Sequence, residues 1–443
     1  MVNTTPVDPL SVQDSASALP TAALPLKAAV VSRPAYPPAA AIPTQIGPIG
    51  IRFDFNQGAR ILVPERATGT WHVRLRDLDS GNILFESQNT GALVNSSKRW
   101  FVRFGVEIWS QDGADEKIEV LSHEFDLDDR EVLILFPVGT LGDVLAWFPS
   151  VARFADRHAG ARVTCALSAL IIPLLQDAYP NLNLVTHAEV VERKLAETMY
   201  ATYAVGLFFD DNACDWQPTD FRHDGLHRTA AYILGVDPTE MPPHMKLPDE
   251  SRPLVEPYVC IAVQSSSGCK YWTNPTGWLD VVAFLRAAGY RVLCIDQKPA
   301  HGSGLMWTQI PHGAEDETGD RPLVERARLL RHADFFIGLS SGLTWLAWAA
   351  GTPVVLISGF THPTNEFATP YRVTNWHACN SCWNDTKHRF DHHDFLWCPR
   401  HAGTSRHFEC SRLITASAVT QTIRRIPGFA GHTTTQPHAA YLT

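Results

Sequence analysis

Hydrophobic and polar positions divide the chain into segments with different patterns. Residues 1–47 are rich in Ala, Pro, Ser and Thr and show no sustained period of 2 or 3.6 residues. They offer little apolar surface to offset the entropy of ordering, which predicts a disordered leader. Residues 48–127 hold short alternating runs, such as Trp71 to Leu75 and Trp100 to Ile108, between Gly and Asp clusters. These runs predict antiparallel strands and a small N-terminal β-barrel.

Near residue 130 the pattern changes to continuous apolar runs that are followed by helical spacing. Glu131 to Pro137 is such a run, and helical spacing extends from Asp143 to His158. A second series begins at Tyr258 to Val263, where Asn274 and Pro275 predict the start of the next helix. Buried strands that alternate with helices predict an α/β fold. The expected divisions are the leader 1–47, the β-barrel 48–127, α/β domains at 128–250 and 251–430 with a proline-rich linker at 238–257, and a tail at 431–443.

Length and charge narrow the classes of function. The chain has 443 residues, enough for two or three domains, and a net charge of -9. A nucleic-acid partner requires a basic surface, so we expect none. The chain contains no run of 18 apolar residues, so we expect no membrane span. The first positive side chain is Lys27, so a secretory signal is not expected. We therefore predict a cytoplasmic protein.

Four of the nine cysteines lie close together: Cys379, Cys382, Cys398 and Cys410. Two, fifteen and eleven residues separate them in turn. This spacing is typical of a metal finger, because four thiolates can surround zinc or a single iron as a tetrahedron. Spacing does not distinguish the two metals. Disulfides or chance clustering are the alternative, but the other cysteines, such as Cys260, lie in apolar runs as in reduced intracellular proteins.

Six histidines lie in the same segment, which we predict to form a finger at 376–412 within the C-terminal domain. An imidazole there can bind the metal directly, but we expect these histidines to be solvated or to lie beside the ligands. These residues are His377, His388, His392, His393, His401 and His407.

Two loops of the second α/β series have the composition of phosphate-binding loops. Small residues after a strand let backbone N–H groups approach phosphate oxygens, and the helix that follows adds favourable partial charge. Lys270 ends the first loop and either reaches a diphosphate or is an ordinary exposed lysine. Ser340, Ser341 and Gly342 form the second and either bind phosphate or cap the next helix. Two α/β domains with such loops suit a sugar-nucleotide transferase.

Asp143 lies in the first turn of the first α/β helix. A carboxylate there can simply stabilise the helix dipole. Alternatively, it is the base that a hydroxyl acceptor requires. A nicotinamide oxidoreductase is disfavoured because the loop 139–143 lacks the Gly-x-Gly-x-x-Gly pattern. A zinc-ribbon interaction module would explain the cysteines and nothing else.

The motifs, taken in order, resemble those of the bacterial autotransporter heptosyltransferases, relatives of the lipopolysaccharide heptosyltransferases. The resemblance covers about residues 48–430 and rests on the series rather than on any single loop. The motifs are Gly-Thr-Leu-Gly-Asp at 139–143, the Ser-Ser-Gly-Cys-Lys loop with Tyr271 and Trp272, the loop from Gly338 to Thr344, Asn365-Glu366-Phe367 and the four cysteines.

The resemblance implies a GT-B glycosyltransferase fold with an N-terminal β-barrel. It also implies transfer of heptose from ADP-heptose to serine hydroxyls of an autotransporter adhesin passenger domain, in a Gram-negative bacterium. One iron ion per chain in the finger is implied, with zinc as the alternative, and a large homo-oligomeric ring such as a dodecamer. Another nucleotide-sugar transferase of the GT-B class is the alternative function.

Carried over by motif, Asp143 is the catalytic base of an inverting single displacement and Lys270 binds the donor phosphate. The lipopolysaccharide enzymes usually have Asp and His where Ser340 and Trp345 stand here, which agrees with a protein acceptor rather than a lipid. The implied substrate-binding residues are Thr140, Leu141, Gly142, Lys270, Trp272, Ser340, Ser341, Gly342, Leu343, Thr344, Asn365 and Glu366, and the implied metal ligands are Cys379, Cys382, Cys398 and Cys410.

Overall fold

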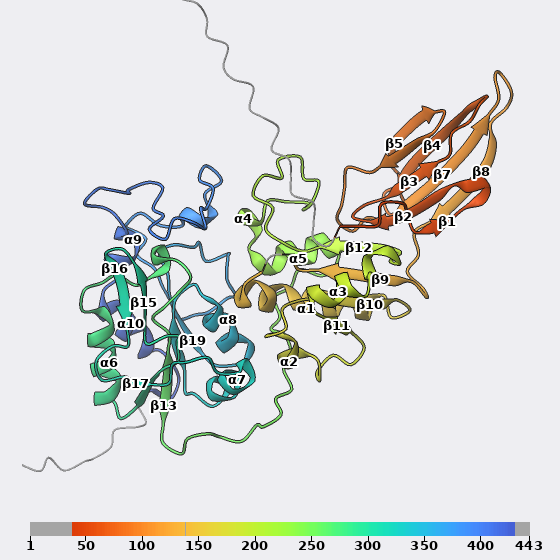
Figure 1. Cartoon of the computed structure of the whole chain (residues 1–443). Coiled ribbons are helices and arrows are strands. Elements are labelled where there is room, and N and C mark those ends of the chain that lie inside the picture. Colours follow the sequence, from red (N-terminus) through yellow and green to blue (C-terminus); the bar gives the residue numbers. More distant parts are fainter. Residues whose placement is uncertain (1–37, 138, 430–443) are drawn as a thin grey trace, which may run out of the picture. The chain divides into compact units, whose positions relative to one another are not determined.

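The computed structural model describes residues 38–137 and 139–429 (Figure 1). Most of the predicted leader, up to residue 37, and the whole predicted tail lie outside the described residues. Within the described ranges, no helix is both long enough and apolar enough to cross a membrane.

Antiparallel strands fill the N-terminal part, as the alternating pattern predicts. In β4 the odd positions Trp71, Val73 and Leu75 are buried and the even ones are partly exposed, so one face packs on a core. One group of strands comprises β1 (Gln45–Ile46), β2 (Arg52–Asn56), β3 (Arg60–Val63) and β6 (Ala92–Asn95). The short helix η1 (Pro48–Gly50) lies between β1 and β2. A separate sheet has the order β5 (Ile83–Asn89), β4 (Thr70–Asp77), β7 (Phe104–Gln111) and β8 (Ile118–Glu124).

The first α/β domain is built on parallel strands in the order β11-β10-β9-β12. Strand β2 pairs in parallel with β12, so this sheet continues into the N-terminal strands β3 and β6. Both regions therefore contribute to one hydrophobic core. The strands are β9 (Glu131–Leu135), β10 (Arg162–Ala166), β11 (Asn183–Val185) and β12 (Ala201–Ala204), and the helices are α1 (Leu141–Arg157), α2 (Ile172–Leu175), α3 (His187–Glu192), η2 (Leu195–Glu197), α4 (Phe221–Asp224) and α5 (Leu226–Leu234).

The second α/β domain contains a six-stranded parallel sheet in the order β17-β14-β13-β18-β19-β20. No helix or strand occurs in the fully described range 238–257, the predicted linker. The strands are β13 (Tyr258–Ile261), β14 (Arg291–Cys294), β17 (Glu315–Asp316), β18 (Phe336–Gly338), β19 (Val354–Ile357) and β20 (Arg372–Val373). The helices are η3 (Gly268–Lys270), α6 (Gly277–Ala287), α7 (Leu323–Arg331), α8 (Gly342–Ala349) and α10 (Ala416–Ile423), and a hairpin of β15 (Ala300–Ser303) and β16 (Met306–Gln309) was not predicted.

The predicted N-cap of helix α6 is wrong by two residues. Thr276, not Asn274, is the N-cap of α6. The side chain of Asn274 instead accepts a hydrogen bond from the backbone N–H of Thr276 at 3.3 Å, which forms a turn before the helix. A Cβ on Gly277 would lie 2.5 Å from the ring of Trp272. The helix therefore begins at a glycine that lets the indole pass close to the backbone.

The segment 376–412 contains little regular structure. Its helices are η4 (Cys382–Asn384) and α9 (Glu409–Arg412). It has a hydrophobic cluster of its own, which also includes Phe360, from the end of β19, and Phe221, from α4. A backbone hydrogen bond also joins the segment to the loop after β19: the N–H of Ser381 donates to the carbonyl of Gly359 at 2.8 Å. The finger is thus a separate small core attached beyond the carboxyl end of β19.

Candidate functional site

Two serine hydroxyls lie unsatisfied at the carboxyl ends of adjacent strands. Strands β13 and β18 pair in parallel, so the loops that follow them lie at the same edge of the sheet. Within the described structure, the buried Oγ atoms of Ser265 and Ser341 have no hydrogen-bond partner. Buried polar atoms are nearly always paired, so each such exception requires an explanation. Hydroxyl donors at this edge suit a ligand that carries phosphate oxygens.

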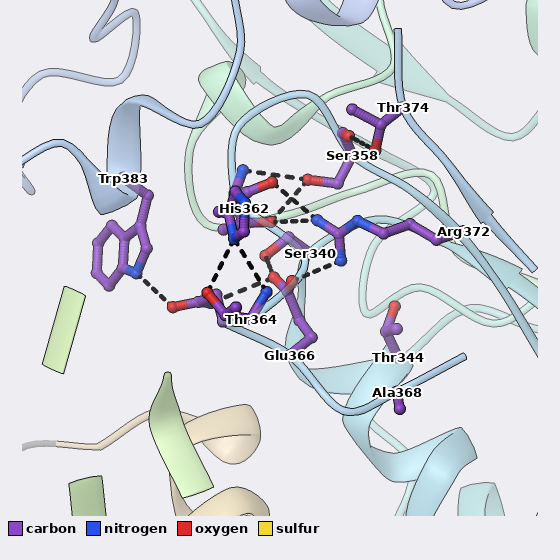
Figure 2. Close-up of polar contacts among 12 residues, drawn as sticks. Ser340, Thr344, Ser358, His362, Thr364, Glu366, Ala368, Arg372, Thr374 and Trp383 are labelled. Atoms are coloured by element: carbon purple, nitrogen blue, oxygen red, sulfur yellow. Dashed lines mark hydrogen bonds and ion pairs between the residues drawn. The ribbon is translucent and has the colours of Figure 1, made fainter. Parts of the chain in front are cut away.

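Ser340 has a different environment from its neighbour Ser341. Its Oγ donates to Oε1 of Glu366 at 2.6 Å, and Nη1 of Arg372 donates to Oε2 of the same carboxylate at 2.8 Å (Figure 2). The side chain of Glu366 is fully buried and that of Arg372 is 11% exposed. The hydroxyl of Ser340 therefore belongs to an internal network, whereas the buried hydroxyl of Ser341 has no partner among the described residues.

The predicted substrate residues Asn365 and Glu366 are held by contacts within the protein. Nδ2 of Asn365 donates to Glu366 at 3.3 Å, and the indole N–H of Trp383 donates to Oδ1 of Asn365 at 2.8 Å (Figure 2). Nη2 of Arg372 donates to the carbonyl of Thr361 at 2.8 Å. The network thus joins the loop after β18 to β20 and to the finger, and it fixes the shape of the loop that begins α8.

Lys270 lies at the end of η3 with its ammonium against aromatic rings. Its Nζ is 5.6 Å from the ring centre of Phe360 and 6.0 Å from that of Trp383, within cation–π range. Among the described residues, no carboxylate forms an ion pair with it. The positive charge of Lys270 therefore remains available for an anionic ligand.

Asp143 has the structural role that its position in the first turn predicts. Its Oδ2 accepts hydrogen bonds from N and Oγ1 of Thr140, at 2.8 and 2.9 Å, and the two residues form a capping box. Its other oxygen, Oδ1, accepts no hydrogen bond from any described residue. The capping interaction therefore fixes the carboxylate and leaves one oxygen able to accept a proton.

Two glycines bring the starts of α1 and α8 into contact. A Cβ on Gly142 would lie 2.6 Å from Cδ1 of Trp345, and a Cβ on Gly342 would lie 2.9 Å from Cβ of Leu141. Only residues without a side chain allow this approach. Both glycines were predicted to bind substrate, and the structure gives them a packing role that places Asp143 near the loop of Ser341.

Three further predicted substrate residues lie mainly within the C-terminal domain. Trp272 is buried and its indole N–H donates to the carbonyl of Ile414 at 2.9 Å. Thr344 is also buried, and its Oγ1 donates to the carbonyl of Leu339. Leu343 is partly buried and packs against the hydrophobic core. Ser265, by contrast, was not predicted, although the Ser/Gly composition of its loop was the signal that could have identified it.

The finger thiols lie close enough to affect one another's ionisation. Burial, together with the neighbouring Cys379 and Cys398, raises the pKa of Cys382 to about 12, although Arg400 opposes the shift. Burial also raises the pKa of Cys410, to which the other three finger cysteines add. Four such thiols can lose their protons together only beside a cation, so this donor set fits a thiophilic metal such as iron or zinc.

A tighter group of metal-binding atoms shares one member with the predicted quartet. Ligand atoms of Cys379, His401 and Glu409 lie within 4.8 Å of one another. Glu409, however, already accepts from Nη2 of Arg406 at 2.6 Å and from the backbone N–H of Cys379 at 2.9 Å. Its carboxylate is thus engaged in positioning Cys379. His401 was considered in the sequence as a ligand or neighbour, whereas Glu409 was missed.

Comparison with protein families gives two matches. The model described as glycosyltransferase TibC, N-terminal domain, matches residues 47–112. The model described as glycosyltransferase family 9 (heptosyltransferase) matches residues 230–393.

Curated relatives match over most of their length. The autotransporter heptosyltransferase BAHTCr of Citrobacter rodentium is 54% identical, over 87% of this chain and 91% of its own. TibC of Escherichia coli O78:H11 is 52% identical and also covers 87% of this chain and 91% of its own length. BimC of Burkholderia thailandensis, described as an inactive autotransporter heptosyltransferase, is 47% identical over 89% of this chain and 90% of its own.

A solved structure with a similar fold is that of the dodecameric iron-containing heptosyltransferase TibC in complex with ADP-D-β-D-heptose. It is 51% identical, covers 87% of this chain and 98% of its own, and has a TM-score of 0.81. A second TibC structure, described as a bacterial iron-containing dodecameric glycosyltransferase, has a TM-score of 0.82. This agreement confirms the predicted GT-B fold.

Proposed function

The chain belongs to the autotransporter heptosyltransferases, and on this premise we propose that it transfers heptose from ADP-heptose to serine hydroxyls of an autotransporter adhesin passenger domain. One relative is described as inactive, so the proposal is argued from residues of this chain. The observation that carries it is the pair of unsatisfied hydroxyls: Ser265, on the loop that ends at Lys270, and Ser341, on the loop after β18. Hydroxyls and an ammonium without an ion-pair partner are suited to a diphosphate.

The reaction is a single displacement at the anomeric carbon. Oδ1 of Asp143 takes the proton from the serine hydroxyl while the serine oxygen bonds to that carbon, and the bond from the carbon to the ADP oxygen breaks. Lys270, the free serine hydroxyls and the start of α8 stabilise the negative charge on the departing ADP. Attack and departure occur on opposite faces of the sugar, so the anomeric configuration inverts.

The capping box makes Asp143 suitable for this role. Two hydrogen bonds from Thr140 hold Oδ2, so the orientation of the carboxylate is set before substrate binds. The contact of Gly142 with Trp345 places the start of α1 against α8. The base and the phosphate-binding loop are therefore held near each other by the fold itself.

We further propose that Cys379, Cys382, Cys398 and Cys410 hold one iron ion per chain, with zinc as the alternative. Four thiolates complete a tetrahedral sphere and leave no position for substrate, so the metal stabilises the finger rather than taking part in the reaction. Elemental analysis of the purified protein tests this assignment. About one metal per chain is expected, and replacement of Cys379 and Cys382 by Ser should abolish it; unchanged metal content would rule the quartet out.

A ring-shaped homo-oligomer, as in the dodecameric relative, is also proposed. Strand β5 lies at the edge of its sheet and exposes three consecutive apolar side chains, Ile83, Leu84 and Phe85. Exposed apolar edges are rare on monomers and agree with contacts between copies. A mass measurement in solution tests the subunit count, and a monomer would contradict it. The cytoplasmic location stays a prediction.

The transfer itself is tested with a panel of ADP-, UDP- and GDP-sugars and a serine-rich adhesin fragment. We expect mass to be added to the fragment only with ADP-heptose, at serine, and with inversion at the anomeric carbon. Transfer from a UDP-sugar instead would favour another GT-B transferase. Absence of transfer from every donor would leave a binding module as the better description.

A further inference from the structure

One histidine of the finger, His392, shares an aromatic cluster with Lys270: the ring of His392 packs on Phe390, Phe390 packs on Trp383, and Nζ of Lys270 lies 6.0 Å from the ring centre of Trp383. Lys270 lowers its pKa and Asp143 raises it. Lys270 belongs to the C-terminal domain and Asp143 to the helix that begins the other α/β domain. Coulomb interactions weaken with distance, so these two influences agree with the shared aromatic cluster of His392 and Lys270.

Aromatic contacts hold the ring of His392 in this place. Its centroid is 4.7 Å from that of Phe390 and 6.3 Å from that of Phe209, with edge-to-face angles of 83° and 88°. Phe390 in turn packs on Trp383 and Trp397 in the finger core, at 5.2 and 5.1 Å. Phe209 follows β12 in the first α/β domain. The position of His392 is therefore set by the finger on one side and by that domain on the other.

The nitrogen atoms of this imidazole are not engaged elsewhere. Within the part of the chain that the structure describes, neither ring nitrogen of His392 forms a hydrogen bond or an ion pair. The residue is exposed, so its N–H groups are accessible to a ligand. An oriented imidazole with free nitrogens, in the same aromatic cluster as a lysine that has no ion-pair partner among the described residues, is suited to bind an anion.

We propose that His392 binds the diphosphate of the nucleotide sugar, as the contribution of the finger to the donor site. The inference rests on the function proposed above and extends it, because it assigns the finger a direct role in substrate binding. His392 and Lys270 together then supply hydrogen bonds to phosphate oxygens, and Lys270 supplies the permanent charge.

The electrostatics predict proton uptake when the donor binds. In the free protein, partial burial, followed by Lys270 and His393, holds the pKa of His392 below its usual range. Asp143 and Asp391 oppose this shift. A diphosphate beside His392 and Lys270 offsets the repulsion between them and raises the pKa of His392. Bound protein therefore holds more protons than free protein near neutral pH. Donor affinity should be highest at low pH and fall as pH rises through the bound-state pKa.

The probe for this effect is ADP-heptose without acceptor, bound to the full-length, metal-loaded protein. The phosphates of a sugar-linked diphosphate are both diesters and lack the second ionisation near pH 6 that a terminal phosphate has. Any pH dependence of binding near neutrality therefore belongs to the protein. Calorimetry in buffers of different ionisation heat measures the proton uptake directly, and titrations from pH 5.5 to 8 give the affinity.

Three variants isolate the residue. His392→Ala and His392→Gln should weaken ADP-heptose binding at low pH by roughly tenfold or more, as expected for loss of a hydrogen bond to a charged group, and should abolish the proton uptake. His393→Ala, at the adjacent exposed position, should bind as the parent protein does. Metal content and melting temperature should be unchanged in all three.

The outcomes separate this inference from the proposed function. If the parent protein transfers heptose but takes up no proton on binding, or if both His392 variants bind ADP-heptose with the parent affinity and pH profile, the role of His392 is disproved while the function stands. If the parent neither binds nor transfers ADP-heptose, the proposed function itself fails. Because proton uptake is measured on the parent protein, the test does not depend on the variants folding.

Discussion

The two loops that begin α1 and α8 look alike in sequence and differ in how their polar atoms are used. Each follows a parallel strand, contains small residues and precedes a helix. In the first, the carboxylate of Asp143 and the hydroxyl of Thr140 bond to each other. In the second, Ser340 bonds to Glu366 while Ser341 has no partner in the described structure. Similar sequences thus form an oriented carboxylate in one domain and an unpaired hydroxyl in the other.

The close contact of these two helix starts explains why the difference matters. Gly142 and Gly342 let α1 and α8 approach each other, so the proposed base and the proposed anion site lie on neighbouring helix starts. A displacement with a hydroxyl nucleophile and a diphosphate leaving group needs both. We therefore propose that the loop of α1 serves the chemical step and that the loop of α8 serves donor binding.

The largest expected effect follows from removal of the base. Asp143→Ala should lower kcat by roughly 10²- to 10⁴-fold, the usual contribution of general-base assistance. Transfer rates at saturating ADP-heptose, followed by mass spectrometry of the adhesin fragment, measure it. Thr140→Val is the matched control, because it removes one of the two hydrogen bonds to Oδ2 and keeps the base. A loss below tenfold for Asp143→Ala would mean that its carboxylate serves only the helix.

The buried ion pair between Arg372 and Glu366, which holds the loop that begins α8, should contribute more to the stability of the protein than an exposed ion pair does. Arg372→Met leaves the carboxylate of Glu366 buried without its partner, which typically costs about 3–5 kcal/mol. Urea unfolding measures the loss. The control is Arg291→Met, in a pair with Glu315 whose side chains are 35% and 43% exposed, where about 0–1 kcal/mol is expected. Equal losses in the two variants would contradict the importance of the network.

Lys270 should contribute to donor binding and little to folding. Lys270→Ala should weaken ADP-heptose binding by about 1.5–3 kcal/mol, the range for hydrogen bonds to charged groups. Because the ammonium has no ion-pair partner among the described residues, unfolding stability should change much less. Calorimetric titration gives the affinity. If donor affinity is unchanged, Lys270 is an ordinary surface lysine.

The smallest effect distinguishes the two neighbouring serines. Ser341→Ala should weaken ADP-heptose binding by about 0.5–1.5 kcal/mol and leave stability intact, because its hydroxyl makes no bond in the free protein. Ser340→Ala should instead reduce stability, because Glu366 loses a donor. Parallel binding and unfolding measurements on the two variants check this. The reverse pattern would exchange their roles.

Elements with a continuous hydrophobic pattern could be predicted closely from the sequence. Helix α1 and strand β9 differ from their predictions by two residues or fewer at each end. The hairpin of β15 and β16 was missed because the sequence from 300 to 309 has no regular alternation. Local composition also did not show that Thr276, rather than Asn274, caps α6, since both side chains suit a turn.

The site was predictable in its residue types but not in how each side chain is used. Ser340 and Ser341 are equivalent in the sequence. Only the fold brings Glu366, twenty-six positions away, to one of them. Glu409 likewise reaches Cys379 across thirty positions. Such long-range pairings depend on tertiary packing, so no local pattern separates the unpaired hydroxyl of Ser341 from the paired one of Ser340.

The division of work between the two loops is tested most directly by ADP-heptose binding to the Asp143→Asn variant, measured together with its turnover. Asparagine keeps the shape and the hydrogen bond to Thr140 but cannot accept the proton. We predict donor affinity close to that of the parent protein and a loss of turnover nearly as large as that of Asp143→Ala. Turnover at the parent rate would contradict the account, because the carboxylate would then be only part of the capping box that begins α1.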